Sequence, residues 1–326
     1  MNVSIVIPNY NGEKYIIDCI ASIYDQIGNK RNIIVIDNHS ADTSVSLIKG
    51  KFPNITLIEN DRNFGFAAAV NQGIRASDTK YVILLNNDAF ARKGFVRALV
   101  ECMERDPVIF SAGAKMLRYS EPGTIDDAGD EFTILGWAYK SGDGRPSDEY
   151  NKQRRVFSAC AGAAIYRRQV FEEIGLFDEY FFAYLEDVDI GFRANLHGYK
   201  NVFCPTAEVE HIGSATSGSK YNDFKLRLSA RNNVWLIKKN FPLPMLIIHA
   251  MFFLLGFIIK IFYFAMKGHG RTYVRGLLEG LRTNIANSEF KYKQKASFHS
   301  YLRIEIKLIS GTWSYLKSRL KLKLFT

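Results

Sequence analysis

Short apolar runs alternate with longer mixed segments along the first part of the chain. The apolar runs are rich in β-branched residues and have the length of buried strands; they cover residues 3–7, 33–36, 55–58 and 81–85. The segments between them favour helices, which we expect at residues 15–24, 43–49 and 67–75. Strands that alternate with helices of about ten residues predict an α/β fold with a doubly wound, mostly parallel sheet.

Polar side chains gather where three of these strands end. The clusters are Pro8-Asn9-Tyr10-Asn11, Asp37-Asn38 and Asn86-Asn87-Asp88. In open α/β sheets, ligands bind outside the carboxyl ends of the strands. Asn and Asp also form ordinary turns and helix caps, but three clusters in corresponding positions favour a ligand site over that alternative.

Two polar segments carry chemistry that fits a phosphate-bearing ligand. Asn86-Asn87-Asp88 places a carboxylate beside amide oxygens, which suits a hard cation such as Mg²⁺ or Mn²⁺, although the same residues also make ordinary turns. Residues 63–73 open a helix with small side chains that let a phosphate or sugar approach closely. The sequence has neither a GxGxxG fingerprint nor a Walker A motif, which disfavours nicotinamide chemistry and P-loop hydrolysis.

A second acidic cluster, Glu186-Asp187-Val188-Asp189, follows an aromatic run at residues 180–184. The acidic first turn of a helix over residues 188–196 would explain Asp189. The neighbouring rings would exclude water from the other two carboxyl groups, which is typical of a general base. A lone His is more often structural than a ligand, and the position of His211 after the strand expected at residues 201–203 improves the case for a functional role only modestly.

The composition describes a globular chain with a basic tail. Its 326 residues are 47% hydrophobic and 23% charged, which excludes a disordered protein. The four cysteines form no CxxC pair, which disfavours a disulfide framework or a cysteine zinc site. Residues 118–155, rich in Gly, Asp and Ser, are expected to form a long loop. The net charge of +10 arises from residues 241–326, which carry 14 Lys and Arg against 3 Asp and Glu.

The tail has the pattern of a membrane-associating segment. Residues 243–266 contain only two strongly polar side chains, His249 and Lys260, and are long enough to cross a bilayer. A lysine near the helix centre is unfavourable in lipid, so spanning the bilayer and lying in its interface both stay open. The last thirty residues combine an apolar stripe with Lys and Arg, typical of a helix on an anionic membrane; the alternative is a helix packed on the rest of the protein.

These patterns predict an α/β domain at residues 1–240 and a helical membrane-associating tail at residues 241–326. No basic segment or apolar signal of sufficient length precedes the first strand, so we expect no export signal. Positive charge favours the cytoplasmic face of the inner membrane. The basic tail lacks a recognised nucleic-acid-binding motif, and no nucleic-acid partner is expected.

In this order the motifs resemble family 2 glycosyltransferases, which are inverting enzymes with the GT-A nucleotide-sugar-binding fold. The matching segments are residues 3–12, 35–40, 63–66, 84–89, 175–179, 186–189 and the region near His211. The motif sequences are most similar to those of the rhamnosyltransferase-like branch, which builds bacterial surface polysaccharides. The resemblance implies transfer of a sugar, with rhamnose as a candidate, from a UDP- or dTDP-sugar to a glycan or lipid-linked acceptor.

The resemblance also implies catalytic and metal-binding roles. Asp187 matches the catalytic base of the family, and Glu186 beside it is a second candidate. Asp88 matches the metal-binding acid of the DxD motif, in which Asn86 stands where an acid is common. His211 matches a residue that completes the coordination of Mg²⁺ or Mn²⁺ in several relatives.

Donor binding is expected at the same edge of the sheet. The resemblance implies that Pro8, Asn9 and Asp37 hold the nucleotide base and ribose. The full expected donor-binding set is Pro8, Asn9, Tyr10, Asp37, Asn63, Gly65, Asn71, Asn86, Asn87 and Asp88.

Two other functions compete with sugar transfer. A nucleotidyltransferase would need a Gly-rich loop with Arg or Lys after the first strand, and Asn9-Tyr10-Asn11-Gly12 has no such cation. A catalytically silent membrane scaffold of the same fold is disfavoured by the presence of Asp88, Asp187 and His211.

Overall fold

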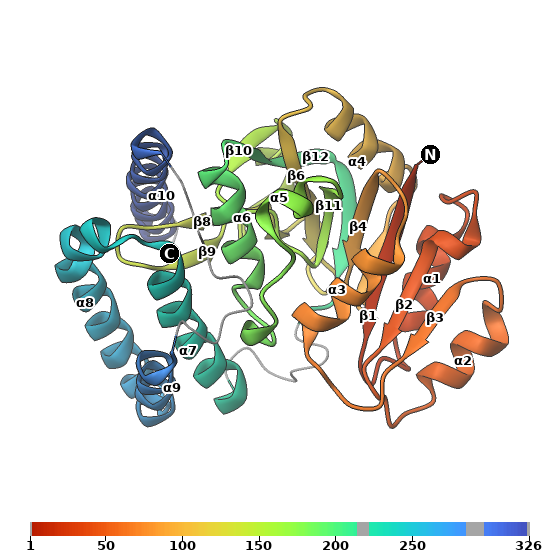
Figure 1. Ribbon diagram of the computed structural model, residues 1–326, viewed down its shortest axis with the longest axis horizontal. Coiled ribbons are helices and arrows are strands. Elements are labelled where there is room, and N and C mark those ends of the chain that lie inside the picture. The colour runs from red at the N-terminus through yellow and green to blue at the C-terminus, as the bar shows by residue number, and fades with distance from the viewer. Residues whose placement is uncertain (1, 214–221, 285–296, 325–326) are drawn as a thin grey trace.

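The computed structural model describes residues 2–213, 222–284 and 297–324, which form a mixed sheet with helices on both faces (Figure 1). The strands of this described part are β1 (Val3–Asn9), β2 (Ile33–Asp37), β3 (Thr56–Glu59), β4 (Tyr81–Leu85), β5 (Ala89–Ala91), β6 (Ile109–Arg118), β7 (Ile125–Asp127), β8 (Asp130–Phe132), β9 (Ala138–Lys140), β10 (Arg154–Val156), β11 (Ala163–Arg167) and β12 (Lys200–His211). The main sheet has the order β10-β12-β6-β11-β4-β1-β2-β3, with β5 beside β12 and β7 beside β6. β8 and β9 form a separate ribbon.

Helices cover both faces of the sheet because its central strands are apolar on both sides. In β1, Ile5 and Ile7 belong to one hydrophobic cluster and Val6 to another. The first face packs against α1 (Ile16–Tyr24), α2 (Ser44–Lys51) and α4 (Phe95–Glu104), and the second against α3 (Phe66–Ala76), α5 (Val170–Ile174) and α6 (Glu186–Leu196). The strand and helix pattern predicted for the first ninety residues is therefore confirmed to within about two residues at each end.

The direction of β11 gives the sheet its mixed character. β3, β2, β1 and β4 run parallel, as expected, and so do β6 and β12. β11 lies between β4 and β6 and runs antiparallel to both. The α/β fold class is confirmed, and the reversed strand places the loop that precedes it at the carboxyl end of β4, where Ala163 pairs with Leu85.

The prediction that residues 118–155 form a long loop is wrong. They contain β7, β8, β9 and the first two residues of β10. Phe132 of β8 is fully buried and packs on Phe157. The Gly- and Asp-rich composition serves tight turns instead: Gly129 has a φ of +98°, and a Cβ there would lie 2.5 Å from Val156 Cγ1.

In the described residues after 221, the C-terminal side of the molecule contains the helices α7 (Asp223–Asn240), α8 (Leu243–Met266), α9 (Gly270–Arg282) and α10 (Phe298–Leu324) (Figure 1). α9 packs closely on α7, where a Cβ at Gly276 would lie 2.3 Å from the carbonyl oxygen of Arg227. Phe253 of α8 and Ile304 and Leu308 of α10 share one hydrophobic cluster with Trp235 of α7. The division into domains at residue 240 stays a prediction, and this cluster contains residues from both sides of it.

A buried ionic network joins α6 to α7 beneath this cluster. Lys239 Nζ lies 2.7 Å from Asp178 Oδ2 and 3.0 Å from Asp189 Oδ2. Arg193 also pairs with Asp189, at 2.8 Å, and Asn240 donates a hydrogen bond to its other oxygen. Burial alone would raise the pKa of Asp189, but Arg193 and Lys239 outweigh it and hold that pKa below its usual value. Asp189 is thus a structural anion.

We predict that Lys239→Met destabilises the protein strongly. The substitution leaves two buried carboxylates short of a cation, and breaking a buried ion pair in this way costs about 3–5 kcal/mol. The free energy of unfolding from denaturant titration measures the effect. Lys51→Met, at an exposed helix end, is the control and should change it by less than about 0.5 kcal/mol. A loss below about 1 kcal/mol for Lys239→Met would contradict this account of the network.

Candidate active site

The polar residues at the ends of β1, β2 and β4 form one hydrogen-bonded network. Asn9 Nδ2 donates to Asp37 Oδ1 at 2.8 Å, and Asn87 Nδ2 donates to Asn9 Oδ1 at 2.9 Å. Ser40 donates to both oxygens of Asp37, through Oγ at 2.6 Å and through its backbone nitrogen at 2.9 Å. The structure therefore brings together the three clusters that the sequence places at strand ends, because parallel strands end at one edge of the sheet.

The other residues of the expected donor-binding set have different surroundings. Pro8 and Tyr10 are half-buried beside the network. Asn63 accepts a hydrogen bond from the backbone nitrogen of Gly65 at 2.9 Å and so shapes the start of α3. Asn71 is fully buried, and its amide bonds to the backbone of Phe177, which ties α3 to the segment before α6. Donor binding by these residues stays a prediction.

Asp88 and His211 meet at the same edge, with a third residue that the sequence reading missed. His211 Nε2 lies 3.2 Å from Asp88 Oδ1, and His211 Nδ1 lies 2.8 Å from Asp126 Oδ2. Burial alone would lower the pKa of His211, but the hydrogen bonds to Asp126 and Asp88 outweigh it and raise that pKa to about 9. Asp126 also accepts from Lys140 Nζ, at 3.0 Å.

The side chains of Asp88, His211 and Asn86 offer donor atoms of the kinds that bind a divalent cation. Nδ1 of His211 donates to Asp126, and loss of the Nε2 proton to a bound cation would leave the Nε2 lone pair beside the Asp88 carboxylate. An imidazole nitrogen beside a carboxylate oxygen suits Mn²⁺, and the carboxylate and the Asn86 amide also suit Mg²⁺. Metal binding by Asp88 and His211 stays a prediction that this geometry supports.

Asp187 reaches the same edge from the start of α6. Its Oδ2 accepts from the backbone nitrogen of Ala161 at 3.3 Å, and its Oδ1 from that of Val188 at 2.8 Å. Gly162, which follows Ala161 in the chain, accepts a hydrogen bond through its carbonyl oxygen from the backbone nitrogen of Asn86 at 2.8 Å. One short loop before β11 thus contacts both Asp187 and the Asn86-Asn87-Asp88 cluster.

The two acids that begin α6 differ in their surroundings. Asp187 is partly exposed, and burial of its carboxyl group raises its pKa despite the hydrogen bond from Ala161. Glu186 is buried with one carboxylate oxygen lacking a hydrogen-bond partner, and burial raises its pKa well above the usual value. Of the two acids, Asp187 is therefore the more accessible and Glu186 the more enclosed.

Residues of the 118–162 segment are the part of the site that sequence reasoning missed. Asp126, Asp127, Asp130 and Lys140 all come from the stretch expected to be a loop. The adjacent Asp126-Asp127 pair, directly after an apolar residue, is a strand-end signal like those at Asp37 and Asp88. Nothing in the local sequence indicates that this strand pairs with β6 at the same edge.

Comparison with known proteins finds relatives of one kind. A family model described as "Glycosyl transferase family 2" matches residues 4–175. N-acetylglucosaminyl-diphospho-decaprenol L-rhamnosyltransferase of Mycobacterium tuberculosis is 28% identical over 215 residues, which cover 57% of this chain and 68% of the relative.

Solved structures show the same fold. The crystal structure of GalNAc-T7 with UDP, GalNAc and Mn²⁺ matches 73% of this chain with a TM-score of 0.59 and 18% identity, and the match covers 48% of that chain, about half its length. Mannosyltransferase PcManGT from Pyrobaculum calidifontis, in complex with GDP-Man and Mn²⁺, matches 94% of this chain and 79% of its own with a TM-score of 0.55 and 14% identity. These likenesses establish a GT-A-like fold.

We predict that Gly65→Ala loosens the segment that carries Asp187. Gly65 has φ +87° and ψ 174°, a conformation that is essentially restricted to glycine, and a Cβ there would lie 2.6 Å from the carbonyl oxygen of Phe182. The variant should lose about 1–3 kcal/mol of unfolding free energy, and residues 180–189 should exchange amide hydrogen faster. Denaturant titration and hydrogen exchange measure the two effects.

Gly28→Ala is the matched control for this prediction. No heavy atom lies within 4 Å of the position of its Cβ, and its φ is not positive. It should leave stability and exchange near α6 unchanged. Equal behaviour of the two variants would show that the contact between Gly65 and Phe182 does not hold the segment in place.

Proposed function

The chain belongs to glycosyl transferase family 2, and we propose that it transfers a sugar from a UDP- or dTDP-sugar to a saccharide acceptor with inversion at the anomeric carbon. The observation that carries the proposal is the convergence of Asp187 and the Asn86-Asn87-Asp88 cluster on the Ala161-Gly162 loop. That loop lies outside the carboxyl end of β4, where ligands of open α/β sheets bind. The GT-A-like fold of the structural neighbours supports the same placement.

Asp187 is the proposed general base. An acceptor hydroxyl is a poor nucleophile near neutral pH, and Asp187 takes its proton as the oxygen forms a bond to the anomeric carbon. The bond from that carbon to the diphosphate breaks, and its electron pair leaves with the nucleoside diphosphate. Attack opposite the leaving group inverts the anomeric configuration. Partial burial raises the pKa of Asp187, which makes its carboxylate a stronger base than an exposed one.

Asp88 and His211 are the residues that would hold a divalent cation, with Asp126 fixing the orientation of the imidazole. A bound cation would supply positive charge to the oxygens of the leaving diphosphate. Asn9 and Asp37, held rigid by their network, are proposed to form the floor of the nucleoside site.

A lipid-linked acceptor is the proposed partner on the other side of the reaction. The Mycobacterium tuberculosis relative is named for an acceptor of this kind. α8 is the described helix long and apolar enough to cross a bilayer, which is compatible with membrane association. The related rhamnosyltransferase also favours rhamnose as the sugar. Surface polysaccharide is the product that the sequence resemblance implies.

We propose that the protein lies on the cytoplasmic face of the membrane rather than crossing it. One face of α8 packs on the protein through Met245, His249, Phe253 and Gly256. If α8 crossed the bilayer, the residues of α7 and β8 that pack with it in one hydrophobic cluster would also have to enter the lipid. Most other side chains of α8 are apolar and exposed, as are Ile309 and Trp313 of α10. These two faces would lie in the interface, with the basic residues toward anionic headgroups.

We predict that Asp187→Asn abolishes most transfer without weakening donor binding. A positioned base contributes about 10²–10⁴-fold in rate, so kcat should fall by that factor while the donor Kd stays within about twofold. Release of nucleoside diphosphate from a panel of UDP- and dTDP-sugars, together with donor-induced thermal shifts, measures both. In the wild type, activity should fall on acidification at a pH above that of an ordinary aspartate, because protonation of Asp187 removes the base.

Glu186→Gln is the comparison for this experiment. It removes the neighbouring carboxyl group and should leave most of the turnover if Asp187 is the base. Near-wild-type turnover of Asp187→Asn, with loss in Glu186→Gln, would move the role to Glu186. Release of pyrophosphate in place of nucleoside diphosphate would contradict sugar transfer itself.

We predict that a double variant with Ile309→Asp and Trp313→Asp binds vesicles that contain phosphatidylglycerol at least tenfold more weakly than the wild type. Both side chains are more than half exposed on α10, and burying one large apolar side chain contributes about 1.5–3 kcal/mol. Flotation with vesicles measures the change. Val108→Asp replaces an exposed apolar residue away from these helices and should bind as the wild type does. Unchanged flotation of the double variant would remove α10 from the proposed interface.

A further inference from the structure

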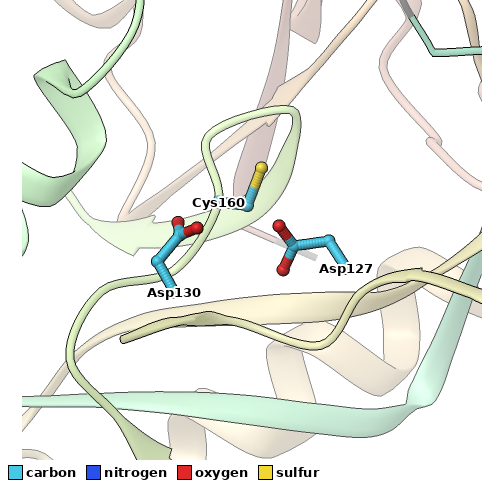
Figure 2. Close-up of side chains that lie close together, drawn as sticks. All are labelled: Asp127, Asp130 and Cys160. Atoms are coloured by element: carbon cyan, nitrogen blue, oxygen red, sulfur yellow. The ribbon is translucent and has the colours of Figure 1, made fainter. Parts of the chain in front are cut away.

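Two aspartates and a cysteine cluster beside the proposed base without taking part in its chemistry. Figure 2 shows the carboxylates of Asp127 and Asp130 pointing toward one another, with Cys160 above them. One oxygen of each aspartate and the Cys160 sulfur all lie within 4.8 Å of one another. Asp127 ends β7 and Asp130 begins β8, while Cys160 belongs to the loop before β11.

Each carboxylate keeps one oxygen that the protein does not satisfy. Asp127 and Asp130 are 1% and 7% exposed, and Oδ2 of each lacks a hydrogen-bond partner. Asp127 Oδ1, by contrast, accepts from the backbone nitrogen of Gly129 at 2.5 Å, which fixes the turn between the two acids. Buried polar atoms are normally hydrogen-bonded, so two unpartnered oxygens facing one space indicate that something else binds there.

The cluster is adjacent to the base through the loop that precedes β11. Cys160 is followed directly by Ala161, whose backbone nitrogen donates to Asp187. The backbones of Asp130 and Ser158 also pair, which fixes the cluster to the same loop. Cys160, the third member of the cluster, is partly exposed, as is Asp187.

The charges around the cluster favour a neutral ligand with hydroxyl groups. Burial raises the pKa of Asp130, as do the nearby Asp127 and then Asp187, and burial raises the pKa of Asp127 to about 6. Lys140 is already close enough to interact electrostatically with Asp127 and Cys160. A divalent cation would have to enter next to this ammonium group, whereas a hydroxyl group donates a hydrogen bond to a carboxylate without that repulsion.

We propose that Asp127 and Asp130 form a subsite that binds hydroxyl groups of the acceptor saccharide beside Asp187. This inference rests on the transferase function proposed above. The two aspartates accept hydrogen bonds from hydroxyl groups next to the one that reacts. They orient the sugar ring so that the reacting hydroxyl faces Asp187, and so act as specificity-determining residues.

Direct binding of a saccharide probe tests the subsite independently of turnover. Octyl N-acetylglucosaminide and its monodeoxy derivatives are titrated into the full chain, as wild type, Asp127→Asn, Asp130→Asn and the control Asp143→Asn. Asp143 belongs to the same segment and pairs with Arg118 outside the cluster. We expect the two cluster variants to bind the intact probe at least tenfold more weakly, and to lose the preference for it over one deoxy derivative. Asp143→Asn should bind as the wild type does.

Stability separates a binding role from a structural one. Asp127→Asn keeps a side-chain oxygen for the hydrogen bond from Gly129, and neither Asp127→Asn nor Asp130→Asn breaks a hydrogen bond at Oδ2, so both variants should be at least as stable as the wild type in thermal unfolding. Loss of stability in parallel with loss of binding would assign the pair a structural role. Equal probe binding by all variants, or no probe binding by the wild type, would overturn the subsite.

The remaining outcomes distinguish a failure of the saccharide subsite from a failure of the proposed transferase function. Zn²⁺ or Mn²⁺ binding that the wild type shows and both cluster variants lose, with probe binding unchanged, would make the cluster a cation site and overturn the proposal. Probe binding that depends on Asp127 and Asp130 in a protein that releases no nucleoside diphosphate from any donor would refute the transferase function while supporting the saccharide subsite.

Discussion

The reversed direction of β11 is the constraint on which the site depends. A strand that runs antiparallel to β4 delivers its preceding loop to the carboxyl end of β4, and Ala163 pairs with Leu85 at that point. The loop then bonds to Asn86 through Gly162 and to Asp187 through Ala161. With β11 parallel to its neighbours, the same loop would lie at the opposite edge of the sheet. The proposed base would then have no fixed relation to the Asn86-Asn87-Asp88 cluster.

The sequence predicts those parts of the fold and site that depend on local pattern. Apolar strands with polar ends identify the four parallel strands and the network of Asn9, Asp37 and Asn87, because parallel order alone brings their ends together. The position of Asp126 depends instead on the pairing of β7 with β6, and that of Lys140 on the pairing of β9 with β8. Hydrophobic periodicity does not predict such pairing, because strands of three residues show too little alternation of apolar and polar residues to be recognised.

The same limit applies to the C-terminal helices. An apolar stripe on α10 could contact either the protein or a membrane, and the structure shows that it has apolar residues on two faces. Ile304 and Leu308 are fully buried in the protein, whereas Ile309 and Trp313 are exposed. Residues five and nine positions apart lie on different sides of a helix, so a single stripe read from the sequence merges two surfaces with different partners. The helix is anchored by one face and leaves the other for a second contact.

The distribution of unpartnered carboxylates argues that the acids around Asp187 serve a ligand. Buried acids elsewhere are neutralised: Asp189 has Arg193 and Lys239, and both oxygens of Asp37 are hydrogen-bonded. Among the described residues, the buried carboxylate oxygens with no hydrogen-bond partner belong to Asp127, Asp130 and Glu186. All three acids interact electrostatically with Asp187. A protein gains no stability from burying carboxyl groups whose oxygens lack partners, and such local strain persists where binding or catalysis requires it.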